Sequence, residues 1–430
     1  MKHTLELTPR DLLFLRDARP MEASDAGLGA NWPRPDQLYH ALLAAFHLRW
    51  PMRQLWEVEH ASRDKCENNT ALRFGALKTV GPFPRKGDKI FFPRPLDLGM
   101  KLVKCEGTDL PVPLKYAFLP AVKGKVSLPQ WVPADVIEKY LAGQTIFKLE
   151  EKDSNLYGAD RNIGIGIDPD TGTTVEHKIY QAEYLRLKEG VTLVGEASCE
   201  MKIKHANRVL DVYNSEETGD ERVEQVVLGG QQGMCSLEID KFKFELPKRP
   251  SDQPPTRFVR WTLLTPAIFQ AGKEPNPKQG EALRKQEGPV YGWFPAWCMR
   301  TDAQGVHRDE IGKVMLARSV KRNDGESRQA WKARQQTAGT IGAKLVAARI
   351  DKPIAFSGWE LPTATTLGGP KPTMLAVPAG SCYIFECDTT DDAKALVDAL
   401  EGIPRSDILG SNGFGVGACS FIPNPEQVNS

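Results

Sequence analysis

Prolines and glycines divide this chain into short segments and constrain its fold more than any other feature. The 430 residues include 32 prolines and 37 glycines. Proline lacks the N–H that a helix interior or a central strand requires, and glycine raises the entropy cost of ordering either element. We therefore expect short strands with few helices, typical of an α+β fold in which helices cover one face of an antiparallel sheet.

A proline-rich stretch near the middle is the clearest domain boundary. Residues 247–256, "PKRPSDQPPT", are polar and show no periodicity. A chain of this length exceeds what one ordinary core accommodates, so two domains are expected. We predict an N-terminal domain over 1–246 and a C-terminal domain over 257–430, with a basic insertion at about 305–352.

The two predicted domains open in a similar way. Residues 5–20 and 261–275 share a strand-like run, a Leu-Thr-Pro, a following Phe and a later Pro. Pro9 and Pro266 should end strand pairing, because proline cannot donate to the hydrogen-bond ladder. This weak internal repeat predicts that each domain begins with a strand leading into a long loop.

Two segments carry helical periodicity. In 36–50, after a candidate N-cap at Asp36, the apolar residues are Leu38, Ala41, Leu42, Ala45 and Leu48. In 390–402, before a candidate C-terminal cap at Gly402, they are Ala393, Leu396, Val397 and Leu400. Strands are predicted at 178–187, 235–246, 258–264, 380–387 and 418–422.

Charge and cysteine positions narrow the class of protein. Basic and acidic residues nearly cancel, 56 against 55, which argues against a chain coated in nucleic acid but permits one local basic surface. Charged residues interrupt the first apolar run, so neither a signal peptide nor a membrane anchor is expected. The eight cysteines form no CxxC pair, so no zinc site is expected. These features predict a cytoplasmic protein without a metal or cofactor.

Four glycines precede the last predicted strand, in "ILGSNGFGVGACSFIP" at 408–423. They fit neither the GxxxxGK[ST] phosphate loop nor the GxGxxG dinucleotide motif, and the loop enters a strand instead of a helix. A turn with positive φ would explain one or two of them. Four within eight residues favour the close approach of a foreign backbone.

An ordered set of motifs carries a resemblance to a known family. The motifs are "LTPRDLLFLRDARP", "NWPRPDQLYHALLAAF", "RNIGIGIDPDTGT", the "LGG" at 228–230, "LTPAIF", "GWELP", "KPTMLAVPAGSCYIFE" and "NGFG". Together they resemble the third subunit of the Cmr-type (type III-B) CRISPR effector complex, within the RAMP superfamily of RNA-binding proteins. The resemblance spans about the whole chain.

The resemblance implies two ferredoxin-like units with insertions. It also implies a non-catalytic subunit that grips the 5′ repeat-derived handle of the guide crRNA and contacts two proteins, the large polymerase-like subunit and an adjacent RAMP backbone subunit. The residues then expected to bind RNA are Arg16, Arg19, Trp32, Arg34, Arg161, Asn162, Gly229, Gly230, Gly410, Gly413, Phe414, Gly415 and Gly417.

The N-terminal loop offers both kinds of group that hold single-stranded RNA, namely cations for phosphates and aromatic rings for bases. Arg16, Arg19 and Arg34 are the cations, and Phe14 and Trp32 are the rings. Alternatively, both rings are buried and the arginines pair with nearby aspartates.

Two further segments are candidates for contact with RNA or a neighbour. Residues 160–180 are predicted to form a hairpin with a Pro-Asp-Thr-Gly turn, which would wedge between nucleotides with Arg161 on phosphate and Asn162 on a base edge. The alternative is a solvated hairpin. Residues 313–352 hold ten basic against three acidic side chains, which favours either a solvated face or a surface for RNA or an acidic subunit.

The chain departs from the family pattern at two places. Gln231 and Gln232 follow Gly229 and Gly230, where an acidic and then a basic residue are expected, so this loop keeps only amide hydrogen bonds. Tyr39 and His40 stand where the first helix of such proteins commonly begins with small residues, which puts a close RNA approach there in doubt.

The main rival function is a metal-independent RAMP ribonuclease that processes repeat RNA. Its general acid or base would be His40, which lies seven residues before His47 on about the same helical face. No second catalytic group is evident nearby, and a histidine on an apolar helix is more often a packed residue.

Overall fold

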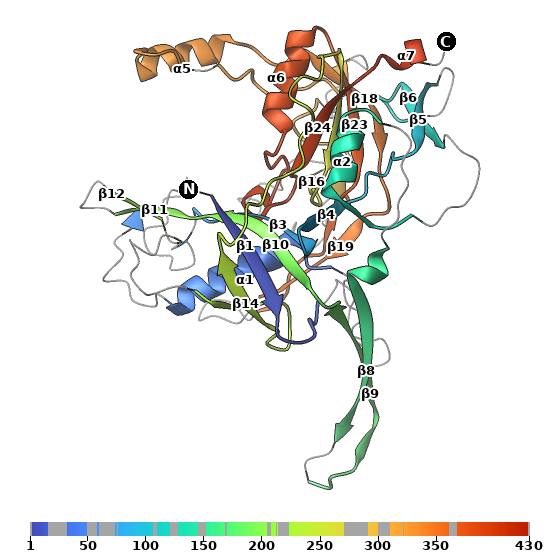
Figure 1. Cartoon of the computed structure of the whole chain (residues 1–430), viewed down its shortest axis with the longest axis vertical. Helices are drawn as coiled ribbons and strands as arrows, with labels where there is room; N and C mark the ends of the chain where they lie inside the picture. The colour runs from blue at the N-terminus through green and yellow to red at the C-terminus, as the bar shows by residue number, and fades with distance from the viewer. Residues whose placement is uncertain are drawn as a thin grey trace, which may run out of the picture.

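The computed structural model describes residues 2–15, 32–49, 58–59, 74, 76–105, 110–120, 128–144, 152–167, 170–203, 208–211, 213, 223–270, 291–299, 310–320, 322–360 and 368–428. Within them the chain is α+β, with mostly antiparallel sheets and few helices, as expected. Two large sheets dominate, and a long hairpin projects from one end of the molecule (Figure 1).

The first large sheet uses strands from the N-terminal half, in the order β13-β14-β1-β10-β3-β4-β7. The strands are β1 (His3–Pro9), β3 (Lys78–Lys86), β4 (Lys89–Pro93), β7 (Trp131–Pro133), β10 (Val191–Ser198), β13 (Gln225–Val227) and β14 (Met234–Ile239). All its neighbours pair antiparallel. The predicted strand 235–246 is too long, because Asp240 adopts a left-handed φ of 55° and its carboxylate accepts from the Thr4 N–H at 2.8 Å.

Helix α1 (Pro35–Arg49) packs against β3 and confirms the first predicted helix (Figure 1). Its buried face includes Leu38, Ala41 and Leu42 as predicted. The stripe is wrong at its end, where Leu48 is 83% exposed and Phe46 is buried instead. Phe46 contacts Phe74 with ring centroids 5.3 Å apart, so an aromatic neighbour from the following loop decides which residue faces inward.

The second large sheet uses strands from the C-terminal half, in the order β18-β23-β15-β24. Its antiparallel strands are β15 (Phe258–Leu263), β18 (Ala343–Arg349), β23 (Cys382–Cys387) and β24 (Gly417–Ile422). Helix α6 (Thr390–Leu400) covers it with the predicted stripe fully buried. The Thr389 hydroxyl caps its N-terminus, and Gly402 follows its end with a φ of 67°.

The predicted repeat occupies equivalent places in the two sheets. β1 lies between β14 and β10, and β15 lies between β24 and β23. In each sheet the last of these strands in the chain, β14 or β24, pairs with the first. Each first strand leads into a long connection, as expected from the repeat.

Smaller elements surround the two sheets. Paired strands are β2 (Val58–Glu59) with β11 (Glu200–Ile203) and β12 (Arg208–Asp211), β5 (Met100–Lys104) with β6 (Tyr116–Pro120), β8 (Tyr157–Ile167) with β9 (Thr174–Leu187), β16 (Phe269–Gln270) with β17 (Tyr291–Gly292), β19 (Ile354–Phe356) with β22 (Met374–Ala376), and β20 (Trp359–Glu360) with β21 (Gly369–Pro370). The remaining helices are α2 (Ala134–Leu141), α5 (Arg328–Thr337), α7 (Pro425–Val428) and the 3-10 turns η2 (Asp153–Asn155) and η4 (Gly410–Asn412).

A buried polar cluster joins the two halves. The Arg260 guanidinium of β15 donates to the Tyr140 carbonyl of α2 at 2.7 Å and lies 3.5 Å from the Asp97 carboxylate. It also stacks on the Tyr140 ring, 3.7 Å from its centroid. The Tyr140 hydroxyl donates to Asp97 at 2.5 Å and lies 3.0 Å from the Thr262 hydroxyl, so residues from both halves satisfy one another.

The proline-rich segment 247–256 lies along both halves. The Gln253 amide donates to the Leu141 carbonyl at 3.0 Å and to the Phe421 carbonyl at 3.2 Å. The apolar cores also meet, since Leu264, Val416 and Ala418 pack within the cluster of the first sheet. The halves are therefore held in a fixed relation by polar and apolar contacts together.

Candidate nucleic-acid interface

Three segments far apart in sequence meet at the base of the β8–β9 hairpin. Leu13 forms a β-bridge with Leu185 of β9, and the neighbouring Phe14 forms one with Gly230. The Phe14 ring also contacts the Tyr184 ring, with centroids 5.4 Å apart. The start of the N-terminal loop, the hairpin and the 228–233 turn therefore form one continuous surface. Arg16 and Arg19, which follow Phe14 closely, lie outside the described residues.

The turn at 228–233 is exposed, and its glycines are required by Phe14. Gly229 has a φ of 81°, and a Cβ there would lie 2.5 Å from the Phe14 carbonyl oxygen. Gln231 and Gln232 also adopt left-handed φ values, 52° and 56°, which cost energy in residues with a side chain. The Gln231 side chain accepts from the Tyr184 hydroxyl at 2.5 Å, so the turn is tied to the hairpin.

The hairpin is the predicted excursion of 160–180, and it carries paired charges at its base. Arg161 donates to Glu183 at 2.9 Å, and Arg186 donates to Asp160 at 2.6 Å, while Asn162 is exposed. Because Arg161 already has a carboxylate partner, contact with a phosphate would require this surface ion pair to open. Such pairs contribute about 1 kcal/mol or less, so opening it costs little.

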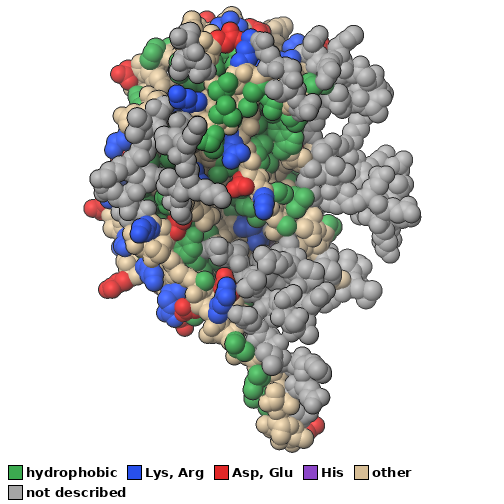
Figure 2. All heavy atoms as spheres, turned by 90° about the vertical axis from the view of Figure 1, so that its right-hand side faces the viewer, with side chains coloured by type: hydrophobic (Ala, Val, Ile, Leu, Met, Phe, Trp, Pro, Cys, Tyr) green, Lys and Arg blue, Asp and Glu red, His purple; other side chains and the backbone are tan. Residues whose placement is uncertain are grey.

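Beyond those charges the hairpin is apolar on one face. Ile163, Ile165 and Ile167 are 73%, 49% and 62% exposed, and Gly164 and Gly166 alternate with them on the other face. Apolar side chains line the projecting hairpin in Figure 2. Sequence reasoning missed these residues as site candidates, although an alternating Ile-Gly pattern in a strand is itself a signal of one apolar and one bare face.

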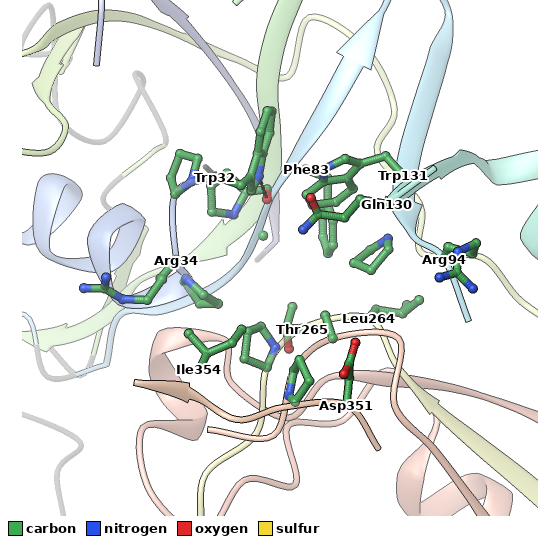
Figure 3. A pocket seen from close by; sticks show the side chains of 18 of the residues that line it. Trp32, Arg34, Phe83, Arg94, Gln130, Trp131, Leu264, Thr265, Asp351 and Ile354 are labelled. Atoms are coloured by element: carbon green, nitrogen blue, oxygen red, sulfur yellow. Dashed lines mark hydrogen bonds between the residues drawn. The ribbon is translucent and has the colours of Figure 1, made fainter. Parts of the chain in front are cut away.

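A cavity of about 920 Å³ lies between the two halves (Figure 3). One wall comes from the N-terminal half and includes Trp32, Phe83, Arg94, Gln130 and Trp131, and the opposite wall comes from the C-terminal half and includes Leu264, Thr265, Asp351, Ile354 and Ala355. Several prolines also line it. Its size and mostly apolar lining suit a flat organic ring with a few polar anchors.

The charges of this cavity nearly balance. The Arg94 guanidinium donates to the carbonyls of Pro129 and Pro95 at 2.9 and 3.2 Å. Burial lowers its pKa from the ordinary value, and the nearby carboxylates of Asp153 and Asp351 oppose that shift. Two arginines, Arg34 and Arg94, therefore face two aspartates, and the cavity favours a neutral ring over a phosphate.

Polar anchors stand on opposite walls of the cavity. The Gln130 side-chain oxygen accepts from the Tyr157 hydroxyl at 3.0 Å, which directs its amide nitrogen inward (Figure 3). Burial raises the pKa of Tyr157 to about 12, so this hydroxyl keeps its proton. Asp351 offers carboxylate oxygens from the other wall. Gln130, Tyr157 and Asp351 carried no sequence motif, and only the folded chain brings them together.

Trp32 and Arg34 were predicted RNA contacts, and the structure places both at the cavity. The Trp32 indole donates to the Pro82 carbonyl at 2.9 Å and packs against the rings of Trp131 and Tyr157. It is buried, as the alternative of an anchoring residue predicts. Arg34 pairs with Asp36 at 3.0 Å. Through Tyr157, the first residue of β8, the cavity adjoins the hairpin base.

The C-terminal glycines lie elsewhere, and the prediction that they leave room for RNA is wrong. A Cβ on Gly413 would lie 2.6 Å from the Thr79 carbonyl oxygen of β3, and one on Gly415 would collide with the backbone at Ser406. A Cβ on Gly417 would collide with the Trp261 side chain. The close approach is therefore real, but the approaching atoms belong to the protein.

Phe414 and Gly410 are the other two residues of this segment that were predicted to bind RNA. The Phe414 side chain is fully buried with Ile268 and Ala376, so it cannot stack on a base. Gly410 is partly exposed, and a Cβ there would meet only Pro404 at an ordinary 3.5 Å, so contact at this residue stays a prediction.

The rival catalytic histidine, His40, lies at an exposed position of α1. His40 contacts the Tyr39 ring, and partial desolvation lowers its pKa from the ordinary value. His47 packs on Phe74. Among the described residues, no group of three His, Cys, Asp or Glu side chains is placed to hold a metal ion. No helix in the described ranges is long and apolar enough to cross a membrane.

Comparisons with known proteins give the family. The model of the family "CRISPR-associated protein (Cas_Cmr3)" matches residues 5–422. No curated protein matches the sequence. One similar solved structure is a type III-B Cmr-beta complex bound to cognate target RNA, with 13% identity, a TM-score of 0.40, and a match that covers 96% of this chain and 95% of that chain. Another is a Csm3–Csm4 subcomplex, with 11% identity, a TM-score of 0.35, and a match that covers 89% of this chain and 92% of that chain. TM-scores this low support no further conclusion. The family match over nearly the whole chain confirms the predicted resemblance, and the chain belongs to the Cas_Cmr3 family of CRISPR-associated proteins.

Proposed function

We propose that this chain is a non-catalytic subunit of a type III-B CRISPR effector complex that binds the repeat-derived 5′ handle of the guide RNA. The observation that carries this proposal is the continuity of the surface from the inter-half cavity, through Tyr157, to the hairpin base and the 228–233 turn. A single strand of RNA needs such a path, with places for splayed bases along it.

In this proposal the cavity receives one base of the handle. Its near-neutral charge leaves the phosphates outside, while its apolar walls accept the ring. Asp351 accepts from an exocyclic amine, and Gln130 donates to a ring nitrogen or carbonyl from the other wall. The cavity should therefore prefer a base that carries an amino group, such as adenine or cytosine, over uracil.

The hairpin separates the handle from the rest of the guide. Alternate residues on a strand are about 6.6 Å apart, close to twice the stacking distance of bases, so successive isoleucines fit between unstacked nucleotides. Ile163, Ile165 and Ile167 supply that wedge, with Asn162 reaching a base edge at its root. The paired Arg161 exchanges Glu183 for a phosphate when RNA arrives.

The finer architecture and partners belong to the same proposal. Each large sheet contains the strand order of a ferredoxin-like unit, β14-β1-β10-β3 and β18-β23-β15-β24, and the division between the two domains lies at 247–256. The chain docks the large polymerase-like subunit and an adjacent RAMP subunit in the cytoplasm. Membership of the Cas_Cmr3 family supports these assignments.

The test measures binding of a labelled handle RNA and a scrambled RNA of equal length to the purified chain. Ala355→Trp places a ring in the cavity from an exposed position, and Lys139→Trp on α2 is the matched control. In the Ala355→Trp variant the ratio of the affinities for handle and scrambled RNA should fall about tenfold or more, because the loss of one base-binding site costs about 1–3 kcal/mol of binding free energy. Equal handle binding by both variants and the wild type would reject the cavity as the base site.

The same mixtures test the rival ribonuclease. The proposal expects the RNA to remain intact after prolonged incubation. A defined cut that disappears in His40→Ala would establish the nuclease instead, with His40 as its general acid or base.

A further inference from the structure

A basic arm extends from the C-terminal half, far from the hairpin (Figure 1). It comprises residues 318–340 except Lys321, which is not described, and includes α5. The Ser327 hydroxyl caps the helix by accepting from the Ala330 N–H at 3.1 Å. None of the ten helical residues is buried, so this helix adds nothing to either apolar core.

One face of α5 contacts the preceding residues of the arm, Val320 and Glu326. The Trp331 indole donates to the Val320 carbonyl at 2.6 Å, and the Gln335 side chain accepts from the Val320 N–H at 2.8 Å. Arg334 pairs with Glu326 at 2.8 Å, and that hydrogen bond lowers the pKa of Glu326 to about 2. A ten-residue helix is unstable alone in water, so these contacts hold it in place.

The other face carries basic and amide side chains together with the small, exposed Ala333. Arg328 and Lys332, one turn apart, lie on it with Gln329 and Gln336, and all four are exposed. Neither Arg328 nor Lys332 has a carboxylate partner among the described residues. The first turn contains no acidic residue, so Arg328 lies unfavourably at the positive end of the helix dipole. Two cations without acidic partners do not stabilise this helix, so stability alone does not explain Arg328 and Lys332.

We propose that this face is a second nucleic-acid contact, which binds the phosphate backbone of single-stranded RNA without reading its sequence. A stable protein interface needs a large apolar or aromatic centre, and the outward face offers no apolar side chain larger than that of Ala333. Phosphate binding needs only cations and amide donors, which are the groups present. The arm lies at the opposite end of the molecule from the β8–β9 hairpin, so it would contact a different stretch of RNA or a different molecule.

The test uses a 30-nucleotide oligouridine, which contains no handle sequence, and the full chain. The affinity is measured from 50 to 300 mM salt for the wild type, for Arg328→Gln/Lys332→Gln, and for the charge-matched control Lys101→Gln/Lys139→Gln. Loss of two phosphate contacts should reduce the slope of log K against log salt by about 1.4 and weaken binding roughly 10- to 30-fold at 100 mM. The control should keep the wild-type slope.

Three outcomes would overturn the proposal. The first is an unchanged slope in the folded arm variant, and the second is no binding of oligouridine by the wild type. The third is an arm variant that loses affinity for polyglutamate but not for oligouridine, which would make the face a protein contact. Handle preference, measured as handle against scrambled RNA, is read separately, so failure of the arm and failure of the handle site are distinguishable. A photo-crosslinking residue at Gln329 should label oligouridine, whereas one at Lys101 should not.

Discussion

Two glycine-rich turns precede equivalent strands of the two large sheets, and their surroundings are opposite. The turn at 228–233 enters β14 and is exposed, while the turn at 408–417 enters β24 and is largely buried. Both contain glycines with positive φ whose missing side chain admits a neighbouring backbone. At Gly229 the neighbour is Phe14 on the same surface, and at Gly413 it is Thr79 from the other half of the molecule.

The difference shows what can be inferred from a glycine cluster. The cluster indicates that another backbone approaches this one closely, because only glycine leaves that space. It does not indicate whether the approaching backbone belongs to the protein or to a ligand. The more glycine-rich turn attracted the functional prediction, yet the atoms beside its glycines belong to the protein, at Gly413 to the other half and at Gly415 and Gly417 to the same half. The turn with two glutamines has the accessible surface.

The largest effect should follow from breaking the buried polar cluster that joins the two halves. Asp97→Leu leaves the Arg260 charge buried without its carboxylate, which should lower the free energy of unfolding by about 3–5 kcal/mol. Denaturant titration measures it. Asp97→Leu/Arg260→Met removes both charges and should recover most of the loss. A loss below about 1 kcal/mol in the single variant would show that the cluster does not hold the halves.

Substitution within the buried turn should have the next largest effect. Gly415→Val forces a branched side chain against the Ser406 backbone at a left-handed φ of 76°, so the expected loss is about 3 kcal/mol. Gly410→Ala, in the same turn but facing ordinary space, should lose under about 1 kcal/mol. Thermal melts of both compare them directly. Equal stability of the two variants would contradict the packing described for this turn.

The exposed turn should tolerate change better than the buried one. Gly229→Ala combines a left-handed φ with a short contact to Phe14, and we expect a loss of about 2 kcal/mol. At Gly230 a Cβ would meet only the movable Phe14 ring, so Gly230→Ala should lose less. If Gly229→Ala destabilises the chain more than Gly415→Val does, the contrast between the turns is reversed.

The smallest expected effect is an increase in stability, from a substitution at Gln232. Gln232→Gly relieves a left-handed residue whose side chain makes no hydrogen bond to the part of the chain that the structure describes. It should raise the free energy of unfolding by about 0.5 kcal/mol after the entropy of the added glycine is subtracted. Gln231→Gly should gain less, because it also loses the Tyr184 hydrogen bond. Calorimetric melts resolve the order. A loss of stability in Gln232→Gly would mean that its side chain holds the turn.

Local patterns in the sequence predicted helices and strands well where a single capping residue or a regular hydrophobic period determines the element. The stripe of α6, its N-terminal acidic turn and Gly402 all hold, because capping and periodicity act over a few residues. The hairpin follows from its turn and its alternating residues. Errors arise where a distant partner intervenes, as when Phe74 favours Phe46 over Leu48 in α1.

The sequence by itself determined the short antiparallel elements, the repeat of β1 and β15, and membership of the family, because each depends on residues near one another or on their order. Only the tertiary structure decided that the C-terminal glycines are filled by Thr79, Ser406 and Trp261, that Arg161 already has an acidic partner, and that Gln130 faces Asp351 across a cavity. Those facts depend on which atoms occupy the space beside a residue, and these atoms come from other segments, nine positions away for Ser406 and tens to hundreds of positions away for the others.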